Sequence, residues 1–257
     1  MSLKLNAPDS VIDSIVAFLR RTYEQQGKTQ AVIAVSGGID SSLSLALLSR
    51  AIPKENITAL ILPYGTQSTT DNELICDFLG IRKEQRRIVN IAPIVDMATT
   101  TLFLSDHDTI RKGNLMARAR MMVVYDTAKE KNALVCGTEN KSEHYLGYYT
   151  RFGDAASDIE PIAHLYKTQV RQLAEYLMFP EQLIKKAPSA GLWAGQTDED
   201  EMGFSYDAAD KVLEAFVDHH TSPAEIRIEG VEPHTVQAVI NQVKANRFKF
   251  HVPYVVE

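Results

Sequence analysis

The chain alternates between two periodicities of apolar residues, and this alternation limits the folds that it can adopt. Short runs rich in β-branched residues, which predict strands, occupy 31–35, 58–63, 86–91 and 133–138. Segments with helical spacing of apolar residues occupy 9–26, 41–50, 71–80, 92–104 and 113–131. Because the strand runs are almost continuously apolar, we expect them to be buried on both faces of a parallel sheet.

From residue 161 onward the pattern is mostly helical. The sequence therefore predicts an α/β fold with an open, twisted, mostly parallel sheet, helices on both faces and a helical C-terminal part, which is a Rossmann-like arrangement. No Pro/Gly/Ser-rich linker and no internal repeat interrupts the chain, so residues 1–257 are expected to form a single domain.

Charge and cysteine usage narrow the class of protein. The formal net charge is -6, which argues against broad binding to nucleic acid or to a membrane surface. No apolar run approaches the roughly 20 residues that a membrane span needs. The two cysteines, Cys76 and Cys136, lack CxxC spacing and are expected to be buried, reduced thiols rather than a disulfide or a metal site. A cytoplasmic location is expected.

The first predicted strand ends in the sequence Ser-Gly-Gly-Ile-Asp-Ser, residues 36–41, directly before a predicted helix. Glycines let backbone N–H groups approach an anion, the helix N-terminus adds positive potential, and the serines add hydroxyl donors. This combination can hold a phosphate, although an ordinary strand-to-helix turn would also use glycine here. The loop has neither the GxxxxGK spacing of a Walker loop nor GxGxxG.

Asp40 places an acid where an anion would bind. A divalent cation between the two negative groups would explain it, because Mg²⁺ prefers carboxylate and phosphate oxygens. The alternative is an acid at a helix start that complements the helix dipole. The turn alone leaves both interpretations open.

Ser-Gly-Gly-x-Asp-Ser after a first strand resembles the pyrophosphate-binding PP-loop of the N-type ATP pyrophosphatases. Further stretches, in order and at matching separations, resemble the ammonia-dependent NAD synthetases over essentially the whole chain. They are LPYGTQ at 62–67, GNLMARARMMVVYDTA at 113–128, the segment 135–174, KKAPSAGLW at 185–193, DEDEMGFSYDAAD at 198–210 and NRFKFHVP at 246–253.

The resemblance implies a ligase that forms a C–N bond. Nicotinic acid adenine dinucleotide (deamido-NAD) would be amidated by ammonia to NAD, the last step of NAD biosynthesis. ATP would adenylylate the carboxylate, releasing pyrophosphate and then AMP. The resemblance also implies Mg²⁺, a homodimer and a cytoplasmic enzyme. A glutaminase domain is not expected, because the first predicted strand already begins at residue 31.

The resemblance also implies site residues. ATP would be bound by Ser36, Gly37, Gly38, Ile39, Asp40, Ser41, Thr138, Lys167 and Ser189. Asp40 and Glu143 would bind the metal, and with Lys167 they would be catalytic. Deamido-NAD would be bound by Arg118, Arg151, Asp158, Phe248 and Lys249.

Some positions leave alternatives open. Arg118 and Arg120 point in different directions on one helix, so at most one is expected to face a given ligand, and the resemblance favours Arg118. Arg151 stands where many members carry lysine, and Phe248 stands where some carry histidine. The glycine-rich, acidic stretch 191–203 predicts a mobile loop, whose acidic run is either solvated or part of a segment that orders over the active site.

Two rival functions remain. A tRNA-modifying pyrophosphatase needs a large basic surface, which the acidic composition does not favour. A protein that binds ATP without turnover could dispense with Asp40, Glu143 and Lys167, and the chain has all three.

Overall fold

The sheet has the predicted parallel arrangement. The computed structural model describes residues 3–105, 107–193 and 195–256. Strands β1 (Gln30–Ala34), β2 (Ile57–Ile61), β3 (Arg86–Ile88) and β4 (Ala133–Cys136) pair in the order β3-β2-β1-β4, and every pair is parallel. Val32 of β1, for example, is in register with Thr58 on one side and Val135 on the other.

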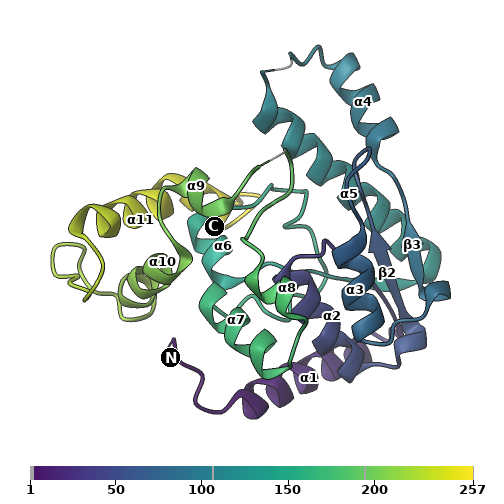
Figure 1. Cartoon of the computed structure of the whole chain (residues 1–257), viewed down its shortest axis with the longest axis horizontal. Helices are drawn as coiled ribbons and strands as arrows, with labels where there is room; N and C mark the ends of the chain where they lie inside the picture. The colour runs from purple at the N-terminus through teal and green to yellow at the C-terminus, as the bar shows by residue number, and fades with distance from the viewer. Residues whose placement is uncertain (1–2, 106, 194, 257) are drawn as a thin grey trace.

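Helices surround this sheet (Figure 1). In the sheet-forming part they are α1 (Pro8–Gln25), α2 (Ile39–Ala51), α3 (Thr70–Phe78), α4 (Ala92–Thr101) and α5 (Thr109–Lys131). After β4 they are α6 (Lys141–Leu146), α7 (Lys167–Tyr176), α8 (Glu181–Lys185), α9 (Asp198–Met202), α10 (Tyr206–Leu213) and α11 (Pro233–Asn246). The predicted elements are present, but α5 starts at Thr109 rather than at 113. Strands β2, β3 and β4 end at Ile61, Ile88 and Cys136, before the predicted ends at 63, 91 and 138.

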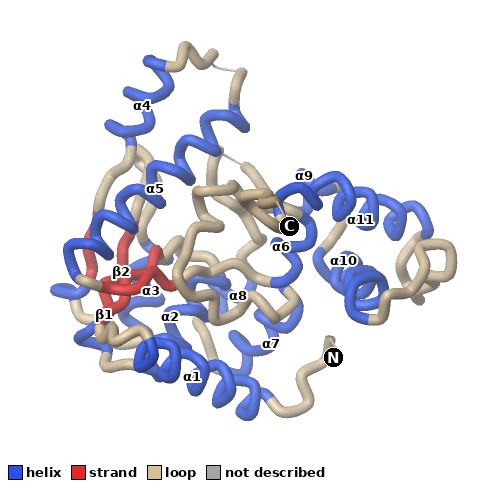
Figure 2. Tube along the Cα trace, turned by 180° about the vertical axis from the view of Figure 1, so that it is seen from behind, coloured by secondary structure: helices blue, strands red, loops and turns tan. Residues whose placement is uncertain are grey.

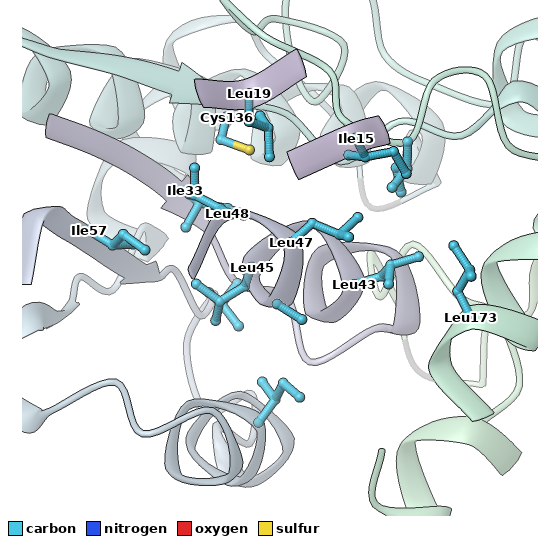
Figure 3. Close-up of a cluster of buried hydrophobic side chains, with 14 of the residues drawn as sticks. Ile15, Leu19, Ile33, Leu43, Leu45, Leu47, Leu48, Ile57, Cys136 and Leu173 are labelled. Atoms are coloured by element: carbon cyan, nitrogen blue, oxygen red, sulfur yellow. The ribbon is translucent and has the colours of Figure 1, made fainter. Parts of the chain in front are cut away.

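The two faces of β1 belong to different hydrophobic clusters, because successive side chains of a strand point to opposite faces. Ile33 packs with residues of α1, α2 and α7 such as Leu19, Leu47 and Leu173 (Figure 3). Val32 packs with residues of α4 and α5 on the other face. Figure 2 shows α1 and the α4–α5 pair on opposite sides of the strands. Both faces of the central strand are therefore covered, as its apolar sequence predicted.

The helical C-terminal part has a hydrophobic cluster of its own. Helices α6, α10 and α11 pack around Tyr206, Leu213 and Ile240, all fully buried. In Figure 1 these helices lie beside the sheet-forming part rather than over it. Helix α7 connects the two parts, since it packs against α2 and also contacts α10.

The order of the strands creates a switch point between β1 and β4. From β1 the chain moves outward through β2 to β3, and then it crosses back to β4 on the other side of β1. In open α/β sheets ligands bind beyond the carboxyl ends of the strands where the order reverses. The loops after Ala34 and after Cys136 leave the sheet at this point.

Both cysteines are buried and free, as predicted. Burial raises the pKa of the Cys76 thiol to about 11, so this thiol stays protonated at neutral pH. Among the helices in the described ranges, none is both long enough and apolar enough to cross a bilayer.

The segment that follows β4 returns to the sheet at Glu160. The N–H of Gly137 donates to the carbonyl of Ile159 (2.8 Å). The Glu160 carboxylate accepts from the N–H of Glu139 (3.0 Å) and from the hydroxyl of Ser157 (2.7 Å). A Cβ at Gly137 would lie 1.8 Å from this carboxylate, so only glycine fits there. Burial raises the pKa of Glu160 to about 8, and the nearby charge of Glu139 adds to the effect.

Glu160→Gln is expected to remove a pH dependence of stability. Between pH 4.5 and about 8 the folded chain holds a proton on Glu160 that the unfolded chain has lost. Wild-type stability therefore falls as the pH rises through this window. Glutamine carries no charge; its amide oxygen can accept from the N–H of Glu139, and its amide nitrogen can donate to the hydroxyl of Ser157. The free energy of unfolding of the variant should match that of the wild type at pH 5 and exceed it at pH 8 by more than about 1 kcal/mol.

Urea unfolding at the two pH values measures this difference. Glu229→Gln, at an exposed position, is the matched control and should leave the pH dependence unchanged. If the unfolding free energies of Glu160→Gln and the wild type depended equally on pH, Glu160 would not be the buried group with the raised pKa.

Candidate active site

The ammonium group of Lys167 lies between two carboxylates at the switch point. Its Nζ is 2.5 Å from Oδ2 of Asp40 and 3.0 Å from Oε1 of Glu143. The Lys167 side chain is only 2% exposed. Asp40 stands in the first turn of α2 after β1, Glu143 in α6 after β4, and Lys167 begins α7. Three distant parts of the chain thus meet at one point.

Local structure holds each member of this trio. Asn140 is the N-cap of α6, and its side-chain oxygen accepts from the N–H of Glu143 (3.0 Å). The amide nitrogen of the same side chain donates to Oδ1 of Asp40 (2.8 Å). The backbone N–H of Lys167 donates to the hydroxyl of Ser142 (2.8 Å). Every member is therefore fixed by a hydrogen bond outside the trio.

The electrostatics of the trio keep Lys167 charged. Burial alone would lower the pKa of Lys167, but the carboxylates of Asp40 and Glu143 outweigh it and raise the pKa above its ordinary value. Burial raises the pKa of Glu143 to about 8, although the ammonium of Lys167 opposes the shift. At neutral pH Glu143 is therefore largely protonated while no cation is bound, and a metal ion that binds here would displace this proton.

The loop between β1 and α2 is closed by its own hydroxyl groups. Oγ of Ser41 accepts from the N–H of Ser36 (3.1 Å), and Ser42 donates to the carbonyl of Gly38 (2.7 Å). Gly38 is the N-cap of α2 and, as a glycine, has no side chain to cap the first-turn N–H groups. Gly37 has φ +73°, and a Cβ there would lie 2.8 Å from Cβ of Asp71. The loop therefore presents backbone donors at a helix N-terminus, which suits an anion.

The carboxylates fit a magnesium ion that is shared with a phosphate. Mg²⁺ is commonly held by one or two carboxylates together with substrate phosphate oxygens. Asp40 and Glu143 supply two hard oxygen ligands, and binding of the metal would release the proton from Glu143. Within the described ranges no three His, Cys, Asp or Glu residues are arranged as a metal cluster. The donor set therefore matches a metal completed by substrate rather than one enclosed by protein.

The remaining predicted ATP residues differ in their surroundings. Ile39 is buried at the start of α2. Thr138 follows β4 at the switch point and is partly buried. Ser189 is exposed after α8, and its hydroxyl accepts from the N–H of Gly191 (3.1 Å). Their contacts with a nucleotide stay predictions.

Three of the predicted dinucleotide residues lie together. The guanidinium of Arg151 is 5.0 Å from the ring centroid of Phe248, a cation–π distance. Nζ of Lys249 donates to the carbonyls of Gly147 and Tyr149. The C-terminal segment is thus bound to the loop after α6 beside Arg151.

The other two predicted dinucleotide residues lie elsewhere on the fold. Asp158 lies beside β4, and its carboxylate accepts from the N–H of Val135 (2.8 Å). Arg118 is exposed on α5. The neighbouring Arg120 donates to the carbonyl of Leu62 (3.1 Å) and to Gln67, so its guanidinium is already engaged by the 62–67 loop. This favours Arg118 as the ligand-facing arginine, which stays a prediction.

Part of the stretch 191–203, which is predicted as a mobile loop, is helical. Residues Asp198–Met202 form α9, and Ala194 lies outside the described residues. Asp198 is 3% exposed and accepts from the N–H of Ala190 (3.1 Å) and from the hydroxyl of Tyr206 (3.1 Å). The interpretation as a wholly solvated acidic run is wrong for this residue. The tyrosine that holds it belongs to another helix, so its burial is not visible in the local sequence.

Asp210 is a site residue that sequence reasoning missed. It is fully buried on α10, and it accepts from the hydroxyl of Ser142 (2.5 Å) and from the N–H of Thr168 (2.8 Å). Burial raises the pKa of Asp210, and these hydrogen bonds oppose the shift. Because Ser142 also holds the N–H of Lys167, Asp210 connects the C-terminal helices to the start of α7. The residues around Asp210 in the sequence form an ordinary helical pattern, so nothing in it distinguishes this buried aspartate from a solvent-exposed one.

Comparison with known proteins shows the family to which the chain belongs. Residues 11–253 match the sequence model of the family described as NAD synthase. The chain belongs to the NAD synthase family. A curated relative from Fusobacterium nucleatum, an NH(3)-dependent NAD(+) synthetase, is 38% identical over 98% of this chain and 97% of its own length. One of the same name from Thermococcus kodakarensis is 40% identical over 95% of each chain. The resemblance to the ammonia-dependent NAD synthetases is confirmed.

Solved structures of this family share the fold. An NMN synthetase from Francisella tularensis superposes with a TM-score of 0.83 at 32% identity, covering 98% of this chain and 99% of its own. An NH3-dependent NAD synthetase from Campylobacter jejuni superposes with a TM-score of 0.80 at 29% identity, covering 98% and 100%. The predicted fold class is confirmed.

Gly37→Ala is expected to weaken ATP binding, and Gly27→Ala is its matched control. Both glycines have positive φ, so alanine is strained at both. A Cβ at Gly27 meets nothing within 4 Å, whereas one at Gly37 meets Asp71. Displacing the loop should remove at least one charge-assisted hydrogen bond to phosphate and raise the Kd for ATP about 10-fold or more. Calorimetric titration measures the Kd for ATP. Equal affinities of the two variants for ATP would contradict the prediction that the 36–41 loop binds its phosphates.

Proposed function

We propose that this chain converts deamido-NAD to NAD with ammonia and ATP. The observation that carries this is the buried trio of Lys167, Asp40 and Glu143 beside the glycine loop, at the switch point of a NAD synthase fold. The names of the curated relatives support ammonia as the nitrogen donor. We further propose that residues 1–257 work as one domain.

The first step activates a carboxylate that is a poor acyl donor on its own. An oxygen of the nicotinate carboxylate forms a bond to the α-phosphorus of ATP, and the bond from that phosphorus to the bridging oxygen breaks. Pyrophosphate leaves with the electron pair, and an acyl-adenylate remains. The carboxylate has lost its negative charge and gained AMP as a leaving group.

The site residues are suited to the charge that builds on the phosphates. The N–H groups in the first turn of α2 would hold phosphate oxygens. The ammonium of Lys167 is fixed in place before substrate arrives, and preorganised charge of this kind is often the largest catalytic contribution. Asp40 and Glu143 would hold Mg²⁺, which when bound would neutralise phosphate charge as a Lewis acid. We propose Thr138 and Ser189 as further ATP contacts.

The second step joins ammonia to the activated carbonyl. The nitrogen lone pair attacks the acyl carbon, the bond to the AMP oxygen breaks, and one proton is lost from nitrogen. Holding ammonia against the adenylate is mainly a proximity effect. Arg151, Phe248 and Lys249, with Arg118 and Asp158, are proposed to bind the dinucleotide.

A homodimer is proposed from the surface of α4 and α5. Large apolar side chains are exposed along these helices and their connection, namely Ile94, Met97, Leu102, Phe103, Ile110 and Met122. Exposed apolar surface of this kind is typical of interaction sites. A cytoplasmic location, without nucleic-acid or membrane partners, is proposed because both thiols are buried and free and the net charge is negative.

A second substrate is supported by the comparison with the NMN synthetase structure, at 32% identity. The same chemistry on nicotinic acid mononucleotide would give NMN. The two candidates share every step at the carboxyl group and differ in whether an adenylyl half must be bound.

The deciding experiment supplies ATP, Mg²⁺ and ammonium with either deamido-NAD or nicotinic acid mononucleotide. The expected result is NAD, AMP and pyrophosphate in equal amounts from the dinucleotide, with a much lower kcat/KM for the mononucleotide. Glutamine in place of ammonium is the control and should give little product. A preference for the mononucleotide would establish the second candidate. ADP and phosphate as products, or turnover only with added tRNA, would overturn both.

A further inference from the structure

A second lysine, Lys186, contacts the glycine loop. Lys186 follows the last residue of α8, and its Nζ lies 3.3 Å from the carbonyl oxygen of Gly37. The same Nζ lies 2.6 Å from Oδ2 of Asp71 in the first turn of α3. The other carboxylate oxygen of Asp71 accepts from the side chain of Gln182 (3.1 Å). Three segments therefore meet beside the turn that would hold the phosphates.

The contact between Lys186 and Asp71 differs from the ion pair that the preceding lysine, Lys185, makes. Lys185 pairs with Glu181 one turn earlier, and both side chains are about three-quarters exposed (73% and 77%). The Lys186 and Asp71 side chains are 44% and 29% exposed, so they lie at the loop rather than in open solvent. Asp71 lies directly against the loop, since a Cβ added at Gly37 would be 2.8 Å from the Cβ of Asp71.

We propose that Lys186 is a further phosphate-binding residue of this site. In the absence of a nucleotide, Asp71 holds the ammonium of Lys186 beside the loop, and when a nucleotide binds, its phosphate replaces Asp71 as the partner of this ammonium. The proposal rests on the proposed function in that it needs a triphosphate in the 36–41 loop. Lys167 is fully enclosed and already faces two carboxylates, so it cannot follow a phosphate that moves away as pyrophosphate. Lys186 is half-exposed on a flexible stem and faces one carboxylate.

The charges at the loop support this assignment. A triphosphate brings several negative charges to a place where the carboxylates of Asp40 and Asp71 already lie. Lys186 can exchange its single carboxylate partner for a phosphate oxygen by rotating its side chain. Asp71 would then retain its bond to Gln182. The lysine thus adds a cation to the phosphates without leaving a buried charge unpaired.

The test compares Lys186→Met with Lys185→Met, an adjacent lysine on the same helix end. Inorganic pyrophosphate and ATP, each with Mg²⁺, are titrated calorimetrically into both variants and the wild type. Lys186→Met should raise both Kd values about 10-fold or more, the contribution of one hydrogen bond to a charged group. Lys185→Met should match the wild type, and Lys186→Arg should recover part of the loss. The KM for deamido-NAD should be unchanged.

Asp71→Asn separates ligand binding from a structural role. The substitution removes the competing carboxylate and keeps the shape, so the Kd for pyrophosphate should stay equal or fall. Wild-type affinity in Lys186→Met, or an Asp71→Asn loss as large as that of Lys186→Met, would overturn the proposal. If Lys186→Met does not fold, Lys186→Gln is compared in the same way. A wild-type enzyme that binds pyrophosphate but forms no NAD would contradict the proposed function alone.

Discussion

The site depends on one interaction, the enclosure of the Lys167 ammonium by the carboxylates of Asp40 and Glu143. Removing one partner of such a buried pair typically costs about 3–5 kcal/mol, because the other charge is left uncompensated. The fold tolerates this arrangement because the hydrogen bond from Asn140 fixes Asp40 and the N-cap of α6 fixes Glu143. The same enclosure gives a rigid positive charge next to the glycine loop at the N-terminus of α2.

The position of the trio follows from the strand order. Because β1 and β4 are neighbours at the switch point, the loops that lead to the helices of Asp40 and Glu143 leave the sheet side by side. Lys167 comes from α7, which lies between the sheet-forming part and the C-terminal helices (Figure 1). Asp210 carries this connection from α10 to the start of α7. The C-terminal helices therefore help to hold Lys167 as well as to bury their own apolar faces.

Much of this was predictable from sequence because it is local. The apolar runs predicted the parallel sheet, and Ser36 to Ser41 predicted a phosphate-binding turn at its carboxyl edge. Contacts between distant segments were not predictable from residue patterns. Asp210 and Asp198 look like solvated helix acids, and only packing from other helices buries them. Lys186 is one of two adjacent lysines, and only the fold distinguishes the one beside Gly37.

The most direct test of the account is isotope exchange between pyrophosphate and ATP without ammonium. If ATP adenylylates the carboxylate of deamido-NAD in the site that contains Lys167, labelled pyrophosphate should enter ATP only when deamido-NAD is present. Lys167→Met should abolish the exchange, because the fixed charge beside the phosphates is lost. Exchange that proceeds without the dinucleotide, or that persists in Lys167→Met at the wild-type rate, would contradict the account.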